Sequence, residues 1–353
     1  MSDLFDYKKE MSELRFTEIQ KKALAEAAAS AARTPAKRRR PVFRTALIAA
    51  AMAAVLVVGS SAAGILPSPT EIFAPLFGGA AAQTEVIDKI GRPIGASDTD
   101  NGITITAEAI MGDQYNAVIV YTLTRDDGER FLPEGKSLDE THLMIDGFNG
   151  ASWVRGCTQG GSWFVDEDPE DNRIQLVETA SSNAVMTKGT ANASFEDLQY
   201  WNTETEQAEL LYPGKWKLRF EVDYEDCSLH LGGGETFSQD DMNFTIDELT
   251  ISPIAVRVAY TADMAVVWSD APSGRQSPED APKAQRFLEN IEILLTKTDG
   301  TVIDLGGSGG RVSPDYEAGV SHCSKGQVFD EIIPLEDMAS LSVGGVTYEI
   351  PHS

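Results

Sequence analysis

The chain has 353 residues and a formal net charge of −26 at pH 7, but this charge is unevenly distributed. Residues 1–44 contain eleven Lys and Arg against six Asp and Glu, whereas the rest of the chain contains 18 basic and 49 acidic residues. Phosphate contacts need positive charge, so we expect the acidic part to bind no nucleic acid.

Residues 1–44 predict a short cytoplasmic helical segment. Thr17 and the Gln three residues later fit a capping box, and strong helix formers follow. Phe16, Ile19 and Leu24 supply a weak apolar stripe on this helix. Because so short a helix is marginal alone, we expect a partner protein to cover Phe16, Ile19 and Leu24.

Residues 45–66 predict a single transmembrane helix. This run contains no charged residue and directly follows the basic cluster Lys37–Arg40 and Arg44. A helix of its length reaches roughly 33 Å, enough to cross the hydrocarbon core of a bilayer. Basic flanks stay in the cytoplasm, so the N-terminus is expected inside the cell membrane and the C-terminal domains outside. A cleaved signal peptide ending at Ala80–Ala82 is the alternative, but the chain before it is much longer than such peptides.

Residues 67–82 predict an extended connector that leaves the membrane. The segment is rich in Pro, Gly and Ala. Its large apolar residues, Phe73, Leu76 and Phe77, fit two locations, the lipid interface or the surface of the first outer domain. The sequence leaves both locations open.

Residues 83–243 predict a first β-sandwich of immunoglobulin-like size. Gly102–Glu108 and Ala117–Leu123 alternate apolar and polar residues and are joined by a polar turn, which indicates an antiparallel hairpin. The alternation is also clear in Lys215–Tyr224, where Trp216 shares a face with the apolar residues that follow. Further strands are expected at His142–Ile145 and Arg173–Glu178.

Residues 244–353 predict a second β-sandwich. Thr245–Tyr260 contains Ser252-Pro253, where proline suits a strand edge or a crossing between sheets. Asp299-Gly300 is a hairpin turn signal, and the polar, proline-rich residues 269–282 indicate a long surface loop. The other expected strands are Ile291–Thr296, Thr301–Leu305, Gln327–Ile333 and Val346–Ile350.

No sequence pattern makes a positive case for catalysis, a cofactor or a metal. The acidic run Asp166–Asn172 lacks the spacing of a calcium loop and is expected to be solvated. The four histidines are scattered, and the glycine clusters at 232–234 and 306–310 lack the Lys-Ser/Thr of a phosphate loop. Three cysteines cannot all pair, and a Cys157–Cys227 bridge remains open.

Three short motifs resemble a membrane-anchored family of Gram-positive bacteria. They are NGITIT with the AVIVYTL strand (101–106 and 117–123), ELTISPIAV (248–256) and IPLEDMASLSVGG (333–345). Members of that family contain a domain of unknown function, and many are called anti-sigma factor-like. The resemblance implies two tandem immunoglobulin-like ectodomains and an inner segment that holds an extracytoplasmic-function sigma factor.

We therefore expect a single-pass signal-transducing protein and not an enzyme. The inner segment has no His and no CxxC, so it would bind a sigma factor through a metal-free helix rather than through a zinc-associated domain. The ectodomain would sense an unidentified envelope ligand. A cell-surface adhesion or scaffold module is the alternative, and a hydrolase is a third possibility without a supporting motif.

Overall fold

A computed structural model describes residues 66–133, 137–138, 142–150, 154, 157–202, 205–269 and 277–352. Within these ranges the fold is mainly β, as predicted. The predicted inner segment and, apart from Leu66, the predicted span lie outside the described residues. None of the helices that the structure describes is long and apolar enough to cross a membrane.

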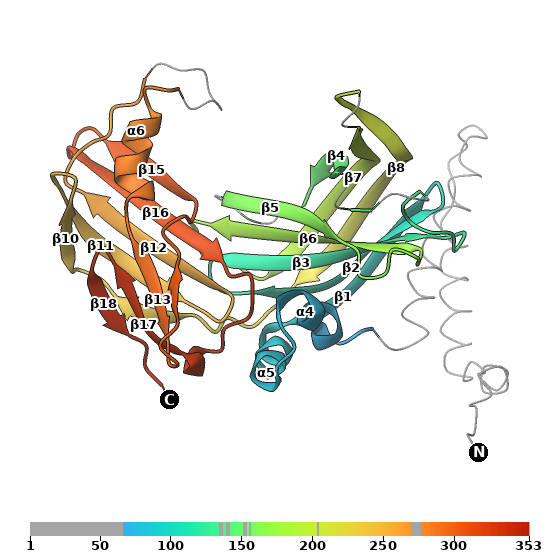
Figure 1. Cartoon of the computed structure of the whole chain (residues 1–353), viewed down its shortest axis with the longest axis horizontal. Helices are drawn as coiled ribbons and strands as arrows, with labels where there is room; N and C mark the ends of the chain where they lie inside the picture. Colours follow the sequence, from blue (N-terminus) through green and yellow to red (C-terminus); the bar gives the residue numbers. More distant parts are fainter. Residues whose placement is uncertain are drawn as a thin grey trace, which may run out of the picture. The chain divides into compact units, whose positions relative to one another are not determined.

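Two antiparallel sheets form the first β unit (Figure 1). The first is a five-stranded sheet in the order β1 (Arg92–Asp100), β2 (Ile103–Gly112), β3 (Asn116–Arg125), β6 (Arg173–Ser182), β5 (Cys157–Val165). The second is a three-stranded sheet in the order β4 (His142–Asn149), β7 (Gly189–Asn202), β8 (Gln207–Val222). The predicted hairpin is confirmed, because Ile103 pairs with Arg125 and Gly112 with Ala117.

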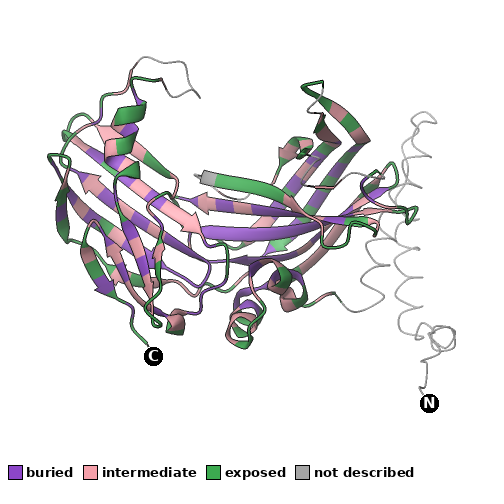
Figure 2. Cartoon of the chain, in the orientation of Figure 1, coloured by how far each residue is buried: buried purple, intermediate pink, exposed green. Residues whose placement is uncertain are grey.

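The core of the first unit lies between these two sheets. In the second half of β8, residues 214–222, every second residue is buried, including Trp216, which is 1% exposed and donates its indole N–H to Ile103 O at 2.9 Å. Tyr121 of β3 packs edge-on against Phe195 of β7. Figure 2 shows that β3 is buried along most of its length. A strand that has elements on both of its faces has this continuous burial, and α4 and α5, described below, cover the outer face.

The second β unit also consists of two antiparallel sheets around one core. One sheet has the order β10 (Thr236–Gln239), β11 (Met242–Ile251), β12 (Ala255–Ala262), β16 (Val320–Val328), β15 (Gly310–Asp315), with β9 (Leu229–Gly232) also on β11. The other has the order β14 (Val302–Asp304), β13 (Ile293–Lys297), β17 (Met338–Val343), β18 (Val346–Glu349). The strands of this unit therefore start at Leu229, before the expected boundary at Phe244.

Several local predictions for this unit are corrected. Ser252-Pro253 lies in the tight connection between β11 and β12, not at a sheet crossing. The strand expected at Gln327–Ile333 ends at Val328, and Phe329 and Ile333 instead donate backbone N–H groups to Ile254 and Pro253. The end of the predicted 269–282 loop enters a short helix, α6 (Ala281–Ala284), which continues as a π-helix over Gln285–Glu289. A 3₁₀ turn spans Leu335–Asp337.

The extended connector predicted at residues 67–82 is wrong, because this segment is largely helical. Helix α4 spans Pro69–Phe77 and α5 spans Ala81–Ile90. The start of α4 has a capping box, in which Ser68 Oγ accepts from Glu71 N and Ser68 N donates to Glu71. Pro69 at the first helical position adds a fixed φ that suits a helix start.

Candidate functional site

The junction of α4 and α5 with both β units is the candidate functional site. Phe73 and Ile87 are 0% exposed, and Phe77 is 3% exposed. They share a hydrophobic cluster with the outer face of the five-stranded sheet, which contributes Ala109, Met111, Val118, Val120 and Val177. The two locations left open for Phe73 and Phe77 are thereby resolved, because both side chains dock on the first β unit and not at a lipid surface.

The same cluster extends to the second β unit. Ile254, Ala255 and Ile332 belong to it. Ile332 N donates to Phe77 O at 2.8 Å, and Gln83 Nε2 donates to Ile332 O at 2.9 Å. The helices that follow Leu66 therefore pack against apolar residues of both β units, and two hydrogen bonds also join them to Ile332 of the second unit.

A buried carboxylate joins the two β units directly. Asp113, in the β2–β3 turn, accepts hydrogen bonds from the backbone N–H groups of Tyr115 and Asn116 at 2.8 and 2.7 Å. Its other oxygen accepts from Ser252 Oγ, in the β11–β12 connection, at 2.6 Å. Burial raises the pKa of Asp113, although these hydrogen bonds act in the opposite direction.

A second polar contact lies beside the first. Tyr115 Oη donates to Glu248 Oε1 at 2.8 Å, and Arg257 Nη1 donates to Glu248 Oε2 at 2.7 Å. The Arg257 guanidinium also lies 4.0 Å from the centre of the Tyr115 ring. Burial and the neighbouring carboxylate raise the pKa of Tyr115 to about 12, so its hydroxyl stays a donor at neutral pH. Both carboxylate oxygens of Glu248 accept hydrogen bonds, one of them from the first unit, which favours a fixed joint, although Arg257 Nε is buried without a hydrogen-bond partner.

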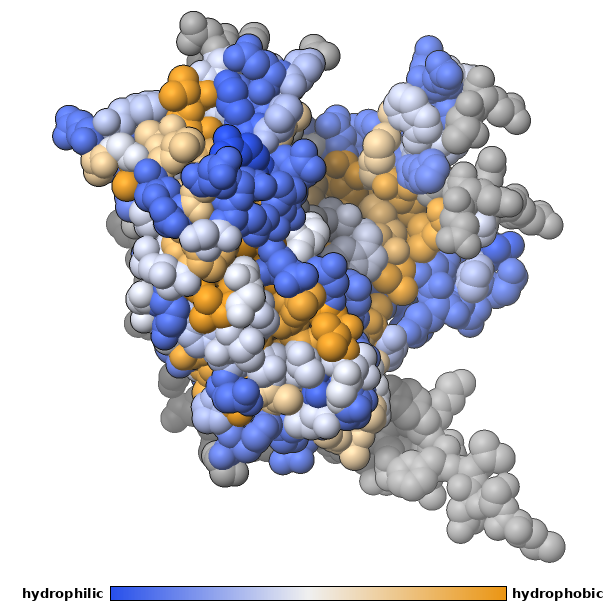
Figure 3. All heavy atoms as spheres, turned by 60° about the vertical axis from the view of Figure 1, so that its left-hand side comes forward, coloured by the Kyte–Doolittle hydropathy of each residue, from blue (hydrophilic) through white to orange (hydrophobic). Residues whose placement is uncertain are grey.

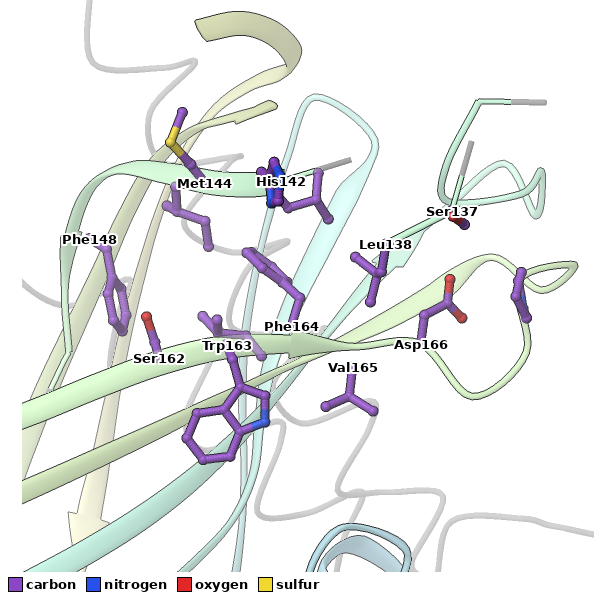
Figure 4. Close-up of a pocket in the computed structure, with 14 residues that line it drawn as sticks. Ser137, Leu138, His142, Met144, Phe148, Ser162, Trp163, Phe164, Val165 and Asp166 are labelled. Carbon is purple, nitrogen blue, oxygen red and sulfur yellow. The ribbon is translucent and has the colours of Figure 1, made fainter. Parts of the chain in front are cut away.

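An apolar groove of about 770 Å³ opens between edge strands β4 and β5 (Figure 4). Phe148 and Phe164 lie in it, whereas Trp163 and Val165 point to the opposite side of β5. His142, Ser162 and Asp166 also line this groove, but no hydrogen bond joins any two of them in the described structure. The groove therefore combines apolar and polar side chains, and among the described residues it presents no serine activated by a base.

The structure places the other predicted features as follows. Phe16, Ile19 and Leu24 lie outside the described residues. The acidic run is the surface connection between β5 and β6, and no group of three or more His, Cys, Asp or Glu among the described side chains could hold a metal ion. Cys227 is a free thiol, and burial raises its pKa to about 12, so the thiol is protonated at neutral pH.

Sequence reasoning missed the residues of the junction. Ser68 and Glu71 carried a capping-box signal for α4, and Phe73 and Phe77 have the four-residue spacing of a helix face. No local pattern indicated Asp113 as a joint, because its partner Ser252 is 139 positions away in the chain.

Much of the surface is hydrophilic, with hydrophobic residues in a more recessed area of the face in Figure 3.

Comparisons with known proteins match part of the chain to a family model. A family model described as a domain of unknown function (DUF4179) matches residues 37–125, which run from the basic cluster through α4, α5 and β1 to β3. No curated protein matches the chain. A solved structure described as "The crystal structure of the conserved domain protein from Bacillus anthracis" is similar at 13% identity and a TM-score of 0.43, covering 72% of this chain and 76% of that one. The segment at 37–125 thus resembles a domain whose function has not been assigned.

Proposed function

We propose that the chain is a single-pass membrane protein that transmits the state of its outer domains to a cytoplasmic sigma factor. Residues 1–44 would be cytoplasmic, 45–66 would span the membrane, and both β units, proposed to be immunoglobulin-like, would lie outside. The chain would act without catalysis or a cofactor. The proposal rests on the expected span and on the way the residues after it are held.

One observation carries the proposal. Leu66 closes the predicted span, and α4 begins three residues later with its apolar face buried against both β units. A helix as short as α4 is not stable alone, so its conformation depends on this docking. Any ligand that alters the contact between the two β units would therefore alter the conformation of α4, which directly follows the proposed span. Transmission across the membrane requires this coupling.

The sigma factor would bind the face formed by Phe16, Ile19 and Leu24. A helix-in-groove contact of this kind is lost when its apolar anchors become charged. The test is affinity purification of the tagged full-length chain from its host, with the retained sigma factors identified by mass spectrometry. The Phe16→Asp, Ile19→Asp, Leu24→Asp triple variant should lose the sigma factor.

A matched control is available on the same predicted helix. Replacing Lys21 and Glu26 by Ala changes its polar face and should leave retention unchanged. The proposal is wrong if the wild-type chain retains no sigma factor, or if the triple variant retains as much as the control.

A surface adhesion or scaffold role is the second candidate, and the apolar groove between β4 and β5 favours it. Met144 lines the groove and is 36% exposed, so an apolar side chain there is accessible to a partner. An adhesion role would survive replacement of residues 1–44 by an unrelated basic anchor, whereas transmission would be lost. Cell attachment and sigma-dependent transcription measured on that one variant separate the two candidates.

A further inference from the structure

A second pocket, of about 400 Å³, lies between β5, the end of β16 and α4, and we propose that it binds a saccharide that carries amino or acetamido groups. We call it the β5–β16 pocket. Its volume is within the range of small-ligand sites. Leu76 and Phe77 of α4 line one side of it. A ligand in this pocket would contact α4, the helix through which the proposed function transmits its signal. The link between ligand binding and sensing rests on that proposed function, whereas saccharide binding itself does not.

An exposed tryptophan beside a bare strip of backbone forms the platform of the pocket. Trp163 is 43% exposed and points to the outer face of the sheet (Figure 4). Gly161 lies two residues earlier on the same face, beside Thr179 of β6. A Cβ added at Gly161 would meet nothing closer than Thr179 Oγ1, at 3.7 Å. The strip beside the indole is therefore open, so a sugar ring has room next to Trp163.

Two polar side chains of the same pocket are available to a ligand. Gln327 and Asp330 line the pocket from the end of β16, and neither side chain has a hydrogen-bond or ion-pair partner among the described residues. An amide offers both donors and acceptors, and a carboxylate offers acceptors only. Together they match the hydroxyl and amino groups of a sugar ring.

The chemistry of the pocket favours a sugar over other ligands. The negative face of an indole attracts the partly positive C–H bonds on one side of a pyranose ring. Asp330 is the one charged residue that lines the pocket in the described structure, so anionic polymers are repelled and an amino sugar is attracted. A proline-rich peptide would also stack on Trp163, but its proline residues have no N–H group to donate to Asp330.

The test is calorimetric titration of the full-length chain, kept in a detergent without a sugar headgroup. The probes are the β-1,4-linked trimers of glucosamine and of N-acetylglucosamine, with maltotriose as the sugar control. The wild-type chain should bind at least one amino-sugar trimer with a dissociation constant at or below about 1 mM and should bind maltotriose more weakly. Asp330→Asn should weaken the glucosamine trimer more than the acetylated one.

Substitutions at two tryptophans of similar exposure distinguish binding in the pocket from a general effect of removing a surface indole. Trp163→Ala should weaken binding at least about tenfold, whereas Trp201→Ala, which removes an indole that is 39% exposed on β7, should leave it unchanged. Gly161→Leu should block the site by filling the strip, and its melting temperature would show whether the fold is retained. The proposal is overturned if neither trimer binds, if Trp163→Ala binds as tightly as wild type, or if only a proline-rich peptide competes for Trp163. Because no sigma factor enters this assay, its failure leaves the proposed function standing.

Discussion

Truncating Phe73 to Ala should release α4 and α5 from the β units while leaving the β units folded. Phe73 is 0% exposed, and its ring centre lies 6.2 Å from that of Phe77 within the cluster on the outer sheet face. Removing a fully buried Phe side chain costs about 3–5 kcal/mol, from lost apolar burial and from the cavity left behind. Helix α4 has nine residues and no independent stability to offset this loss.

The loss of docking free energy is first observed as local opening of α4 and α5. A loss of about 3 kcal/mol from the docked state lowers the protection of amide hydrogens in α4 and α5 by roughly 100-fold. Hydrogen exchange read by mass spectrometry on peptides covering residues 69–90 measures this directly. Peptides from β7 and β8 serve as the internal reference, because their pairing does not involve the helices.

The control is Leu210→Ala, which truncates an apolar side chain that is 54% exposed on β8. It should change stability by no more than about 0.5 kcal/mol. The docking argument is refuted if Phe73→Ala exchanges over residues 69–90 at the wild-type rate, or if β7 and β8 lose protection to the same extent as α4.

Three further predictions follow from buried groups, each measured by urea unfolding. Lys325 is 1% exposed and donates to the carbonyls of residues 288, 291 and 306, so Lys325→Met should cost about 2 kcal/mol. Burial lowers its pKa to about 8 from 10.5, so between these pH values the unfolded chain holds a proton that the folded chain has released. Wild-type stability should therefore gain a contribution as pH rises through this window, and the Met variant should lack it. Asp113→Ala leaves the N–H groups of Tyr115 and Asn116 buried without acceptors and should cost about 2–4 kcal/mol. An unchanged unfolding midpoint would show that Asp113 does not stabilise the contact between the β units. Gly214→Ala places a Cβ in steric conflict with the buried Trp216 ring and should cost about 2 kcal/mol, with wild-type stability as the contrary result.

The strands that the sequence predicted best are those with one buried face and one exposed face. In β8 the residues from Trp216 to Val222 alternate between a buried core face and an exposed face, so the period of two is visible in the sequence. β1 was missed because most of its residues are only half-buried and its apolar pattern is weak. The turn signal was nevertheless present, since Asn101 and Gly102 both adopt positive φ between β1 and β2.

The candidate junction was harder to predict because its parts come from distant positions. Pro75 lies inside α4 and Gly78-Gly79 follows it, and these two features favour an extended connector when composition alone is considered. The docking of Phe73 on a sheet that is also buried from the other side depends on tertiary contacts. Lys325 shows the same limit, because its three carbonyl acceptors come from three different residues outside its own strand.

The most direct test of the account is the amount of sigma factor that the full-length chain retains when α4 is undocked. The chain is purified from its host as wild type, as Phe73→Ala and as Leu210→Ala, at matched abundance, and the retained sigma factor is quantified per chain. Coupling between the outer junction and the inner segment predicts that Phe73→Ala changes retention by about fivefold or more while Leu210→Ala leaves it unchanged. Equal retention in all three proteins would contradict transmission through α4 and α5.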